Sequence, residues 1–263
     1  MIEHVVGFFV SFFQNPNTWG IGLAIAFGAI WLSGYWPPLF KKPWLWVVLV
    51  SSAILALAAA AFIQIPLQIL VGRALGHFWS DEVLLSWILL AGIPQILLSG
   101  LVQEGAKLVP VVTYWWRSGK NIDPKLGLAI GAVSGAGFGI FEAQWAHNAI
   151  FASGWTWEAV QTGGIIALAG FWERFFAVAF HIAASALASY GLAKGWGWQL
   201  YLIASCLHGL LNYSTVLLQS GLLAAVHLEI YAAVLSVLVT AWALWLRWRK
   251  VAADGFEPST KGL

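Results

Sequence analysis

Apolar positions along this chain fall in long runs rather than in the short periodic stripes of a soluble domain. The runs are near 20 residues long, which is the length that a helix needs to cross the hydrocarbon core of a bilayer. Because backbone N–H and C=O groups must be paired inside lipid, such runs predict helices. The expected spans are residues 18–35, 44–71, 93–116, 126–150, 171–193, 198–218 and 223–248. The pattern therefore predicts an all-α polytopic membrane protein with about seven transmembrane helices.

The segments outside these spans complete the predicted organisation. Residues 1–16 are apolar but too short to cross a bilayer, and we expect an amphipathic helix lying in the membrane interface. Residues 17–250 form the transmembrane domain, and residues 251–263 form a polar tail. The apolar segment 83–116 is too long for one straight span, and Gly92-Ile93-Pro94 is expected to divide it into an interfacial or re-entrant piece and the third span.

Composition supports a membrane protein and excludes several other classes. Hydrophobic residues make up 60% of the chain and charged residues 9%, and the mean hydropathy is +0.81. Because Cys206 is the single cysteine, an internal disulfide and a cysteine-based metal cage are excluded. The cations lie in short loops rather than in one patch, so nucleic acid is not an expected partner.

The distribution of cations predicts the orientation in the membrane. With seven spans, the basic residues of four separate connections fall on one side, namely Lys41, Lys42, Arg117, Lys120, Lys125, Lys194, Arg247, Arg249 and Lys250. Cytoplasmic loops of membrane proteins carry such an excess of Lys and Arg. We therefore expect the N-terminus outside and the C-terminus in the cytoplasm.

Charged residues inside the predicted third span need an explanation. Glu104 and Lys107 lie near the middle of the run 93–116, where each charge costs several kcal/mol to insert. At a spacing of i, i+3 on a helix they share a face and can partly neutralise each other. A buried ion pair that joins helices and a functional site are both open at this point.

The fourth predicted span carries a stripe of small residues. Four glycines recur at a spacing of four residues, at Gly127, Gly131, Gly135 and Gly139. Such a stripe allows the backbone of another helix to approach closely. Glu142 lies three residues after the last of these glycines, so we expect it to face a neighbouring helix rather than lipid.

Four predicted spans thus bring polar side chains to similar depths. They are two carboxylates, two imidazoles and one amide, from Glu104, Glu142, His181, His208 and Asn212. This set matches the activation of water by a carboxylate base, with His and Asn as donors to an oxyanion. It equally matches a metal site, because carboxylate and imidazole groups are good zinc ligands. The spacing does not decide between the two.

The motifs resemble those of a known group of proteins. Gln103-Glu104-Gly105-Ala106-Lys107 is similar to the EExxK motif of PrsW-type intramembrane proteases, and Phe138–Glu142 is similar to their FxxxE motif. Glu173-Arg174 with His181, and His208–Asn212 as HxxxN, complete the series in order. The pattern resembles most the YhfC family, in the superfamily of Rce1-type CAAX-processing proteases and APH-1. The resemblance covers residues 90–215.

The resemblance implies a glutamic-type intramembrane endopeptidase in a prokaryotic plasma membrane. Glu104 would be the base that polarises water, with Glu142 as its partner, His208 and Asn212 as the oxyanion site and His181 assisting. A supporting set would surround them, in which Lys107 and Arg174 keep the carboxylates ionised; its members are Gln103, Lys107, Glu173 and Arg174. The substrate would be a transmembrane or lipid-anchored protein or peptide.

The cofactor expectation is none, with zinc as the alternative. The candidate metal ligands in that case are Glu142, His181 and His208.

One departure from the motif leaves other functions open. Gln103 stands where the EExxK motif has its first Glu, so the base has moved to Glu104 or has been lost. A non-catalytic scaffold, like APH-1, is therefore one alternative. A proton-coupled carrier is another, because Glu and His chains also form proton relays, although no inverted repeat is visible in the sequence.

Overall fold

A computed structural model describes residues 2–249, with side chains from residue 6 onward. The predicted polar tail, 251–263, lies outside the described residues. Among those residues the secondary structure consists of helices without a β-strand. The helices are α1 (Ile2–Ser11), α2 (Thr18–Ser33), α3 (Trp44–Ala59), η1 (Ala60–Gln64), α4 (Ile65–Phe78), α5 (Asp81–Ser86), α6 (Ile88–Ala91), α7 (Ile93–Arg117), α8 (Pro124–Ala152), α9 (Trp157–Gly163), η2 (Ile165–Leu168), α10 (Ala169–Ala193), α11 (Gly197–Gln219) and α12 (Ala225–Trp248).

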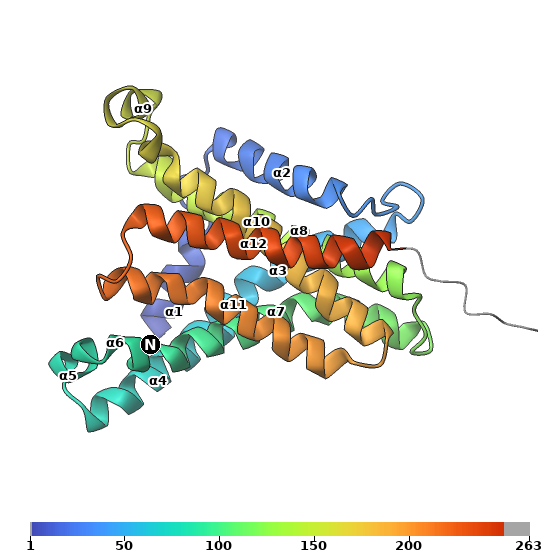
Figure 1. The fold of residues 1–263 in the computed structure, drawn as a ribbon, viewed down its shortest axis with the longest axis horizontal. Coiled ribbons are helices and arrows are strands. Elements are labelled where there is room, and N and C mark those ends of the chain that lie inside the picture. Colours follow the sequence, from blue (N-terminus) through green and yellow to red (C-terminus); the bar gives the residue numbers. More distant parts are fainter. Residues whose placement is uncertain (1, 250–263) are drawn as a thin grey trace, which may run out of the picture.

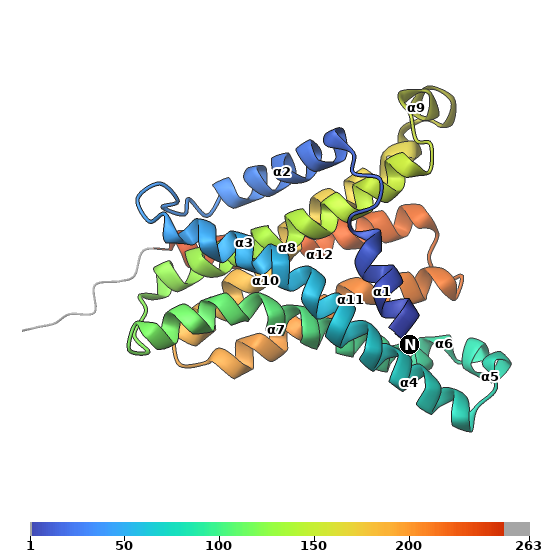
Figure 2. The same cartoon turned by 180° about the vertical axis from the view of Figure 1, so that it is seen from behind.

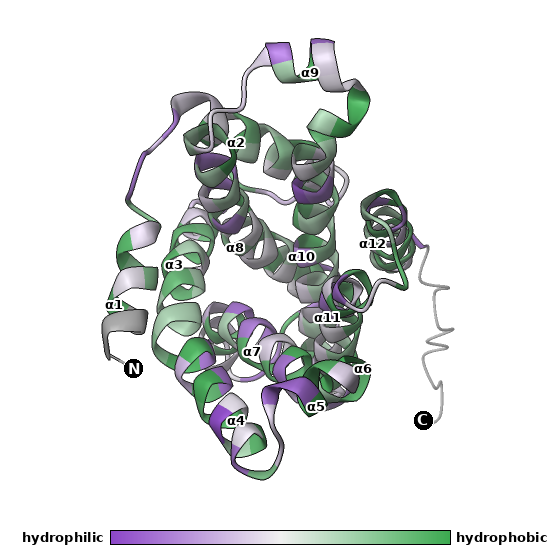
Figure 3. Ribbon diagram, turned by 90° about the vertical axis from the view of Figure 1, so that its left-hand side faces the viewer, coloured by the Kyte–Doolittle hydropathy of each residue, from purple (hydrophilic) through white to green (hydrophobic). Residues whose placement is uncertain are grey.

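The long helices confirm the predicted fold class. Within the described residues, 6 helical stretches are long and apolar enough to cross a membrane, and α2 is a shorter apolar helix of 16 residues. Together they correspond to the seven predicted spans. Figure 3 looks along the bundle and shows predominantly apolar residues on the long helices. Many large apolar side chains are exposed on this surface, for example Ile54 and Leu238, as expected for a surface that faces lipid.

Two helix boundaries differ from the sequence prediction or refine it. The second span continues to Phe78 rather than ending at residue 71, because Gly72 and Gly76 weaken a helix without breaking it. This stretch contains the π-helical turn η1, which ends two residues before Pro66. Segment 83–116 is interrupted at Gly92 as expected, since α5 and α6 are short and α7 begins at Ile93. The interfacial or re-entrant placement of its first part stays a prediction.

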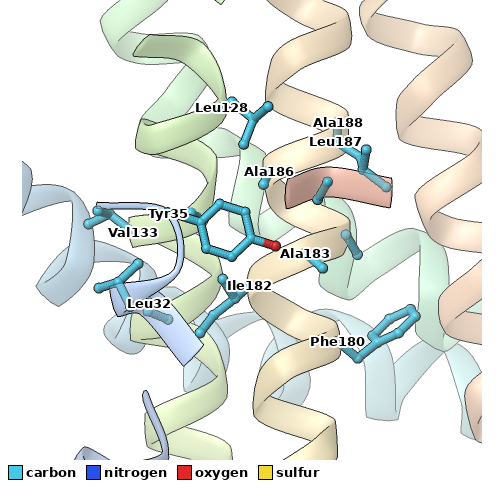
Figure 4. Close-up of a cluster of buried hydrophobic side chains, with 14 of the residues drawn as sticks. Leu32, Tyr35, Leu128, Val133, Phe180, Ile182, Ala183, Ala186, Leu187 and Ala188 are labelled. Carbon is cyan, nitrogen blue, oxygen red and sulfur yellow. The ribbon is translucent and has the colours of Figure 1, made fainter. Parts of the chain in front are cut away.

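Helix α8 lies in the centre of the bundle, against α10 on one side and α3 on the other (Figure 1). A Cβ atom added at Gly135 would lie 2.2 Å from the carbonyl oxygen of His181, and one at Gly137 would lie 2.0 Å from that of Leu49. The predicted role of the glycine stripe in close helix packing is thus confirmed. The contact between α8 and α10 is also the place where the apolar core forms, around residues such as Tyr35, Leu128 and Phe180 (Figure 4).

The connections that carry the cations lie at one end of the bundle (Figure 1). Arg247 donates to the carbonyl oxygen of Tyr35 at 2.8 Å, and Arg249 donates to the hydroxyl of Tyr190 at 2.6 Å. At the other end, α1 crosses beside η1 and α8 (Figure 2). There the ring of Phe12 stacks on those of Phe141 and Trp145.

Candidate functional site

Helix α7 presents a polar face to the interior of the bundle. Its residues recur at a spacing of four, at Gln95, Ser99, Gln103 and Lys107, with Glu104 beside them. Glu104 and Lys107 are 0% exposed, and Gln103 is 7% exposed. Because burial of a charge is unfavourable without a partner, the contacts of this face define the site.

The carboxylate of Glu104 contacts two side chains, Lys107 and His208. Its Oε1 atom lies 2.5 Å from Nζ of Lys107 and 2.7 Å from Nδ1 of His208 on α11. A neutral His208 that donates its Nδ1–H to this carboxylate retains the lone pair on Nε2. The second carboxylate oxygen, Oε2, is buried and has no hydrogen-bond partner among the described residues. The carboxylate therefore has one oxygen left for a ligand.

His181 on α10 joins the two predicted carboxylates into one network. Its Nδ1 atom lies 2.8 Å from Nζ of Lys107, and its Nε2 atom lies 2.6 Å from Oε2 of Glu142 on α8. An ammonium group only donates hydrogen bonds, so Nδ1 is the acceptor and Nε2 carries the proton that Glu142 accepts. This contact also confirms that Glu142 faces a neighbouring helix.

Arg174, two turns before His181 on the same helix, supports Glu142. Its guanidinium lies 3.7 Å from Oε2 of Glu142 and is paired with both carboxylate oxygens of Glu173. Around the histidines, the three carboxylates of Glu104, Glu142 and Glu173 thus face the two cations of Lys107 and Arg174. With neutral histidines these five groups together carry one net negative charge, which attracts a cation to this region.

Asn212 lies apart from the carboxylate of Glu104. Its Nδ2 atom donates to Oγ of Ser99 at 3.1 Å, and the same oxygen accepts from Nε2 of Gln103 at 3.4 Å. Asn212 and Ser99 line a cavity of about 350 Å³ between α4, α6, α7 and α11. The structure therefore connects Asn212 to the site through Ser99 and Gln103, without a direct contact to Glu104.

The residues that could hold a metal are Glu104, His181 and His208. One ligand atom from each lies within 4.8 Å of the other two. The structure thus groups Glu104 with the histidines, where the sequence suggested Glu142 as the third candidate. Two imidazoles and one carboxylate form a donor set typical of catalytic zinc, and the free Oε2 of Glu104 fits such a ligand. Lys107 already places a positive charge between Glu104 and His181.

Two serines in this region were not among the predicted site residues. Ser99 links Asn212 to Gln103, and Oγ of Ser134 donates to the carbonyl oxygen of Lys107 at 2.6 Å. The spacing of four residues between Ser99, Gln103 and Lys107 is the signal that could have identified the first. Ser134 has no such signal, because only the packing of α8 against α7 brings it to Lys107.

Comparison with known proteins identifies a family for this chain. The family described as "PrsW family intramembrane metalloprotease" matches residues 41–243, a range that contains all the residues of the site. No curated protein and no solved structure matches significantly. Within the broader resemblance seen in the motifs, the closer likeness to YhfC stays a prediction. The chain belongs to the PrsW family of intramembrane proteases.

Proposed function

We propose that this protein hydrolyses peptide bonds of membrane-embedded or membrane-proximal substrates at the cluster of Glu104, His181 and His208. The observation that carries the proposal is the convergence of one carboxylate and two imidazoles inside a membrane bundle, with one carboxylate oxygen left without a partner. Hydrolysis inside a membrane needs a polar, buried place where water can be activated. The substrates are transmembrane or lipid-anchored proteins or peptides.

The family description and the donor set favour zinc over the absence of a cofactor. Glu104, His181 and His208 would hold the metal, with His181 binding through Nδ1 once Lys107 no longer donates to that atom. Bound zinc would supply a Lewis acid that polarises the scissile carbonyl and lowers the pKa of a water molecule.

Glu142 and Arg174 then have a positioning role. A histidine that binds a metal commonly donates its other ring N–H to a carboxylate, which fixes the orientation and the tautomer of the ring. The Nε2–H of His181 donates to Glu142 in this way, and Arg174 lies near the same carboxylate oxygen. We infer that Glu142 orients His181.

A second candidate mechanism needs no metal, and the position of Lys107 favours it. The ammonium group contacts both Glu104 and His181, so it already supplies the positive charge that a metal would bring. In this glutamic mechanism Glu104 is the general base that takes a proton from water. His208, hydrogen-bonded to Glu104, and Asn212 at the next turn complete the candidate site.

We also propose that the end of the bundle with the cations faces the cytoplasm, with the N-terminus outside, in a prokaryotic plasma membrane. The supporting observation is that Tyr35, which follows α2, and Tyr190 in the last turn of α10 lie against Arg247 and Arg249 at this end of the bundle. Reporter domains fused at either end of the chain test this orientation, and a C-terminal reporter active only outside the cell would contradict it.

The first test of the proposed function is metal content together with cleavage. Detergent-purified protein is analysed for zinc, and cleavage of synthetic transmembrane peptides is measured with and without a chelator. Stoichiometric zinc and chelator-sensitive cleavage support the metalloprotease. Metal-free protein that still cleaves supports the glutamic mechanism. Absence of both zinc and cleavage contradicts the proposal and favours a scaffold.

A further inference from the structure

A cavity of about 240 Å³ lies beside the candidate catalytic cluster, between α1, α3, η1, α4, α7 and α8. Its lining is mainly apolar, with rings from Phe8, Phe12 and Phe141. The polar part consists of three carboxamides and one carboxylate, from Gln64, Gln68, Gln103 and Glu142. Because Glu142 lines the cavity and contacts His181 at 2.6 Å, the cavity borders the place where we propose hydrolysis.

The carboxamide nitrogen of Gln103 is held by hydrogen bonds, but the carboxamide oxygen has no hydrogen-bond partner among the described residues. Its Nε2 atom donates to Oε1 of Gln64 at 3.1 Å and contacts Oγ of Ser99 at 3.4 Å. Its Oε1 atom is buried and has no hydrogen-bond partner among the described residues. A carbonyl oxygen in that state is unfavourable in a membrane interior. Because Gln103 also lines the cavity, a donor on a molecule in the cavity can pair with this oxygen.

Two neighbouring glutamines, Gln68 on α4 and Gln95 on α7, have a structural role. Nε2 of Gln68 donates to the main-chain carbonyl oxygen of Gln95 at 3.1 Å. In return, Nε2 of Gln95 donates to the main-chain carbonyl oxygen of Gln68 at 3.0 Å. This reciprocal pair joins α4 to α7, which is the ordinary role of amides between membrane helices. It involves no polar atom of Gln103, so the acceptor of Gln103 stays free.

The local backbone at Gln64 is also irregular. Gln64 ends the π-helical turn η1, and Pro66 follows with no N–H to donate. Turns of this kind occur often at functional sites. Here the irregular turn carries the glutamine that holds Gln103 in place.

A peptide substrate in a membrane supplies the missing donor. A transmembrane helix pairs all its main-chain groups internally, so exposing one peptide bond leaves main-chain N–H groups without partners in a low-dielectric medium. A carboxamide oxygen is a suitable partner for such a group. We propose that Oε1 of Gln103 accepts a hydrogen bond from an unwound main-chain N–H of the substrate next to the cleaved bond, and that Gln64 positions it.

This inference rests on the proposed function, and it gives the departure at Gln103 a role. It is tested with a synthetic quenched-fluorescent transmembrane peptide and a series of analogues. In each analogue one backbone amide near the cleaved bond is replaced by an ester, which lacks the N–H group. In the unmodified protein, an ester at one position is expected to lower kcat/KM about tenfold.

Variants of the glutamines then identify the partner of that N–H group. Gln103→Met is expected to lower kcat/KM for the parent peptide and to reduce the effect of the ester to twofold or less. Gln64→Met is also expected to lower kcat/KM for the parent peptide and to reduce the effect of the ester. If the methionine variants do not fold, Gln64→Asn is used in place of Gln64→Met. Gln144→Met is the matched control, because Gln144 lies on α8 and is not among the residues that line the cavity.

The outcomes separate the two proposals. If the unmodified protein cleaves no peptide, the proposed function fails and the inference fails with it. If cleavage occurs but the ester effect is the same in Gln103→Met, Gln144→Met and the unmodified protein, the proposed role of Gln103 alone is overturned. Gln95→Met adds a structural control: it is expected to lower thermal stability and to leave the ester effect unchanged.

Discussion

Oε2 of Glu142 lies 2.6 Å from Nε2 of His181, and the two side chains can meet because Gly139 precedes Glu142 by one turn. A Cβ atom at Gly139 would lie 3.2 Å from Cβ of His181, which is tighter than most such contacts. The stripe of small residues therefore serves the site as well as the packing, since it brings the carboxylate of α8 to the imidazole of α10.

The first prediction concerns this pair. Glu142→Gln keeps the shape of the side chain but weakens its attraction for the N–H of His181. If His181 binds zinc, the affinity for zinc should fall by about 10- to 100-fold, measured by competition with a metal-binding dye. Glu158→Gln on the short helix α9 is the control and should bind zinc like the unmodified protein. Equal affinity in both variants would show that Glu142 does not orient a metal ligand.

The second prediction uses Lys107 to distinguish its two possible roles. Lys107→Met leaves the buried carboxylate of Glu104 without its cation, and loss of one partner of a buried ion pair costs about 3–5 kcal/mol. The metal-free variant should therefore melt at a lower temperature than the unmodified protein.

Added zinc should restore most of that loss, because the metal supplies the missing positive charge and the competing ammonium is gone. Lys194→Met, a substitution at an exposed residue, is the control. A variant that zinc does not stabilise argues for the metal-free mechanism.

The third prediction concerns Glu104, the carboxylate to which we assign the catalytic role. Glu104→Gln removes both the base of the glutamic mechanism and a ligand of the zinc mechanism. Cleavage of transmembrane peptides should fall by about 10²- to 10⁴-fold. The protein should still purify as a folded species, with a lower melting temperature because Lys107 loses its buried partner. If the variant cleaves at the rate of the unmodified protein, both mechanisms are contradicted. If the variant does not fold and the unmodified protein has no measurable activity, a scaffold is favoured.

The fourth prediction concerns the packing of α8 on α10. In Gly135→Ala, the new Cβ atom would lie 2.2 Å from a backbone oxygen, so the two helices must separate. We expect destabilisation of about 3 kcal/mol, at the upper end of what overpacking costs, together with reduced cleavage. Gly22→Ala on α2 is the matched control, since a Cβ atom there meets nothing within 4 Å. Thermal melting in detergent compares the two variants, and equal melting temperatures would contradict the close approach.

The sequence alone determined the helical membrane fold, because the length of an apolar run and the need to pair backbone groups in lipid are local properties. It also identified the polar residues inside the spans, since each is improbable in lipid without a reason. The glycine stripe even indicated that the helix before Glu142 approaches another backbone closely.

Only the tertiary structure decided which of these residues meet. It placed Glu104 beside His181 and His208, and it placed Glu142 on the other side of His181. It also showed that Asn212 bonds to Ser99 and makes no direct contact with Glu104. Depth along a helix follows from counting residues, but the rotation of each helix and the identity of its neighbour depend on packing across the whole bundle. For this reason Ser134, which meets Lys107 only through the contact of α8 with α7, has no signature in the sequence.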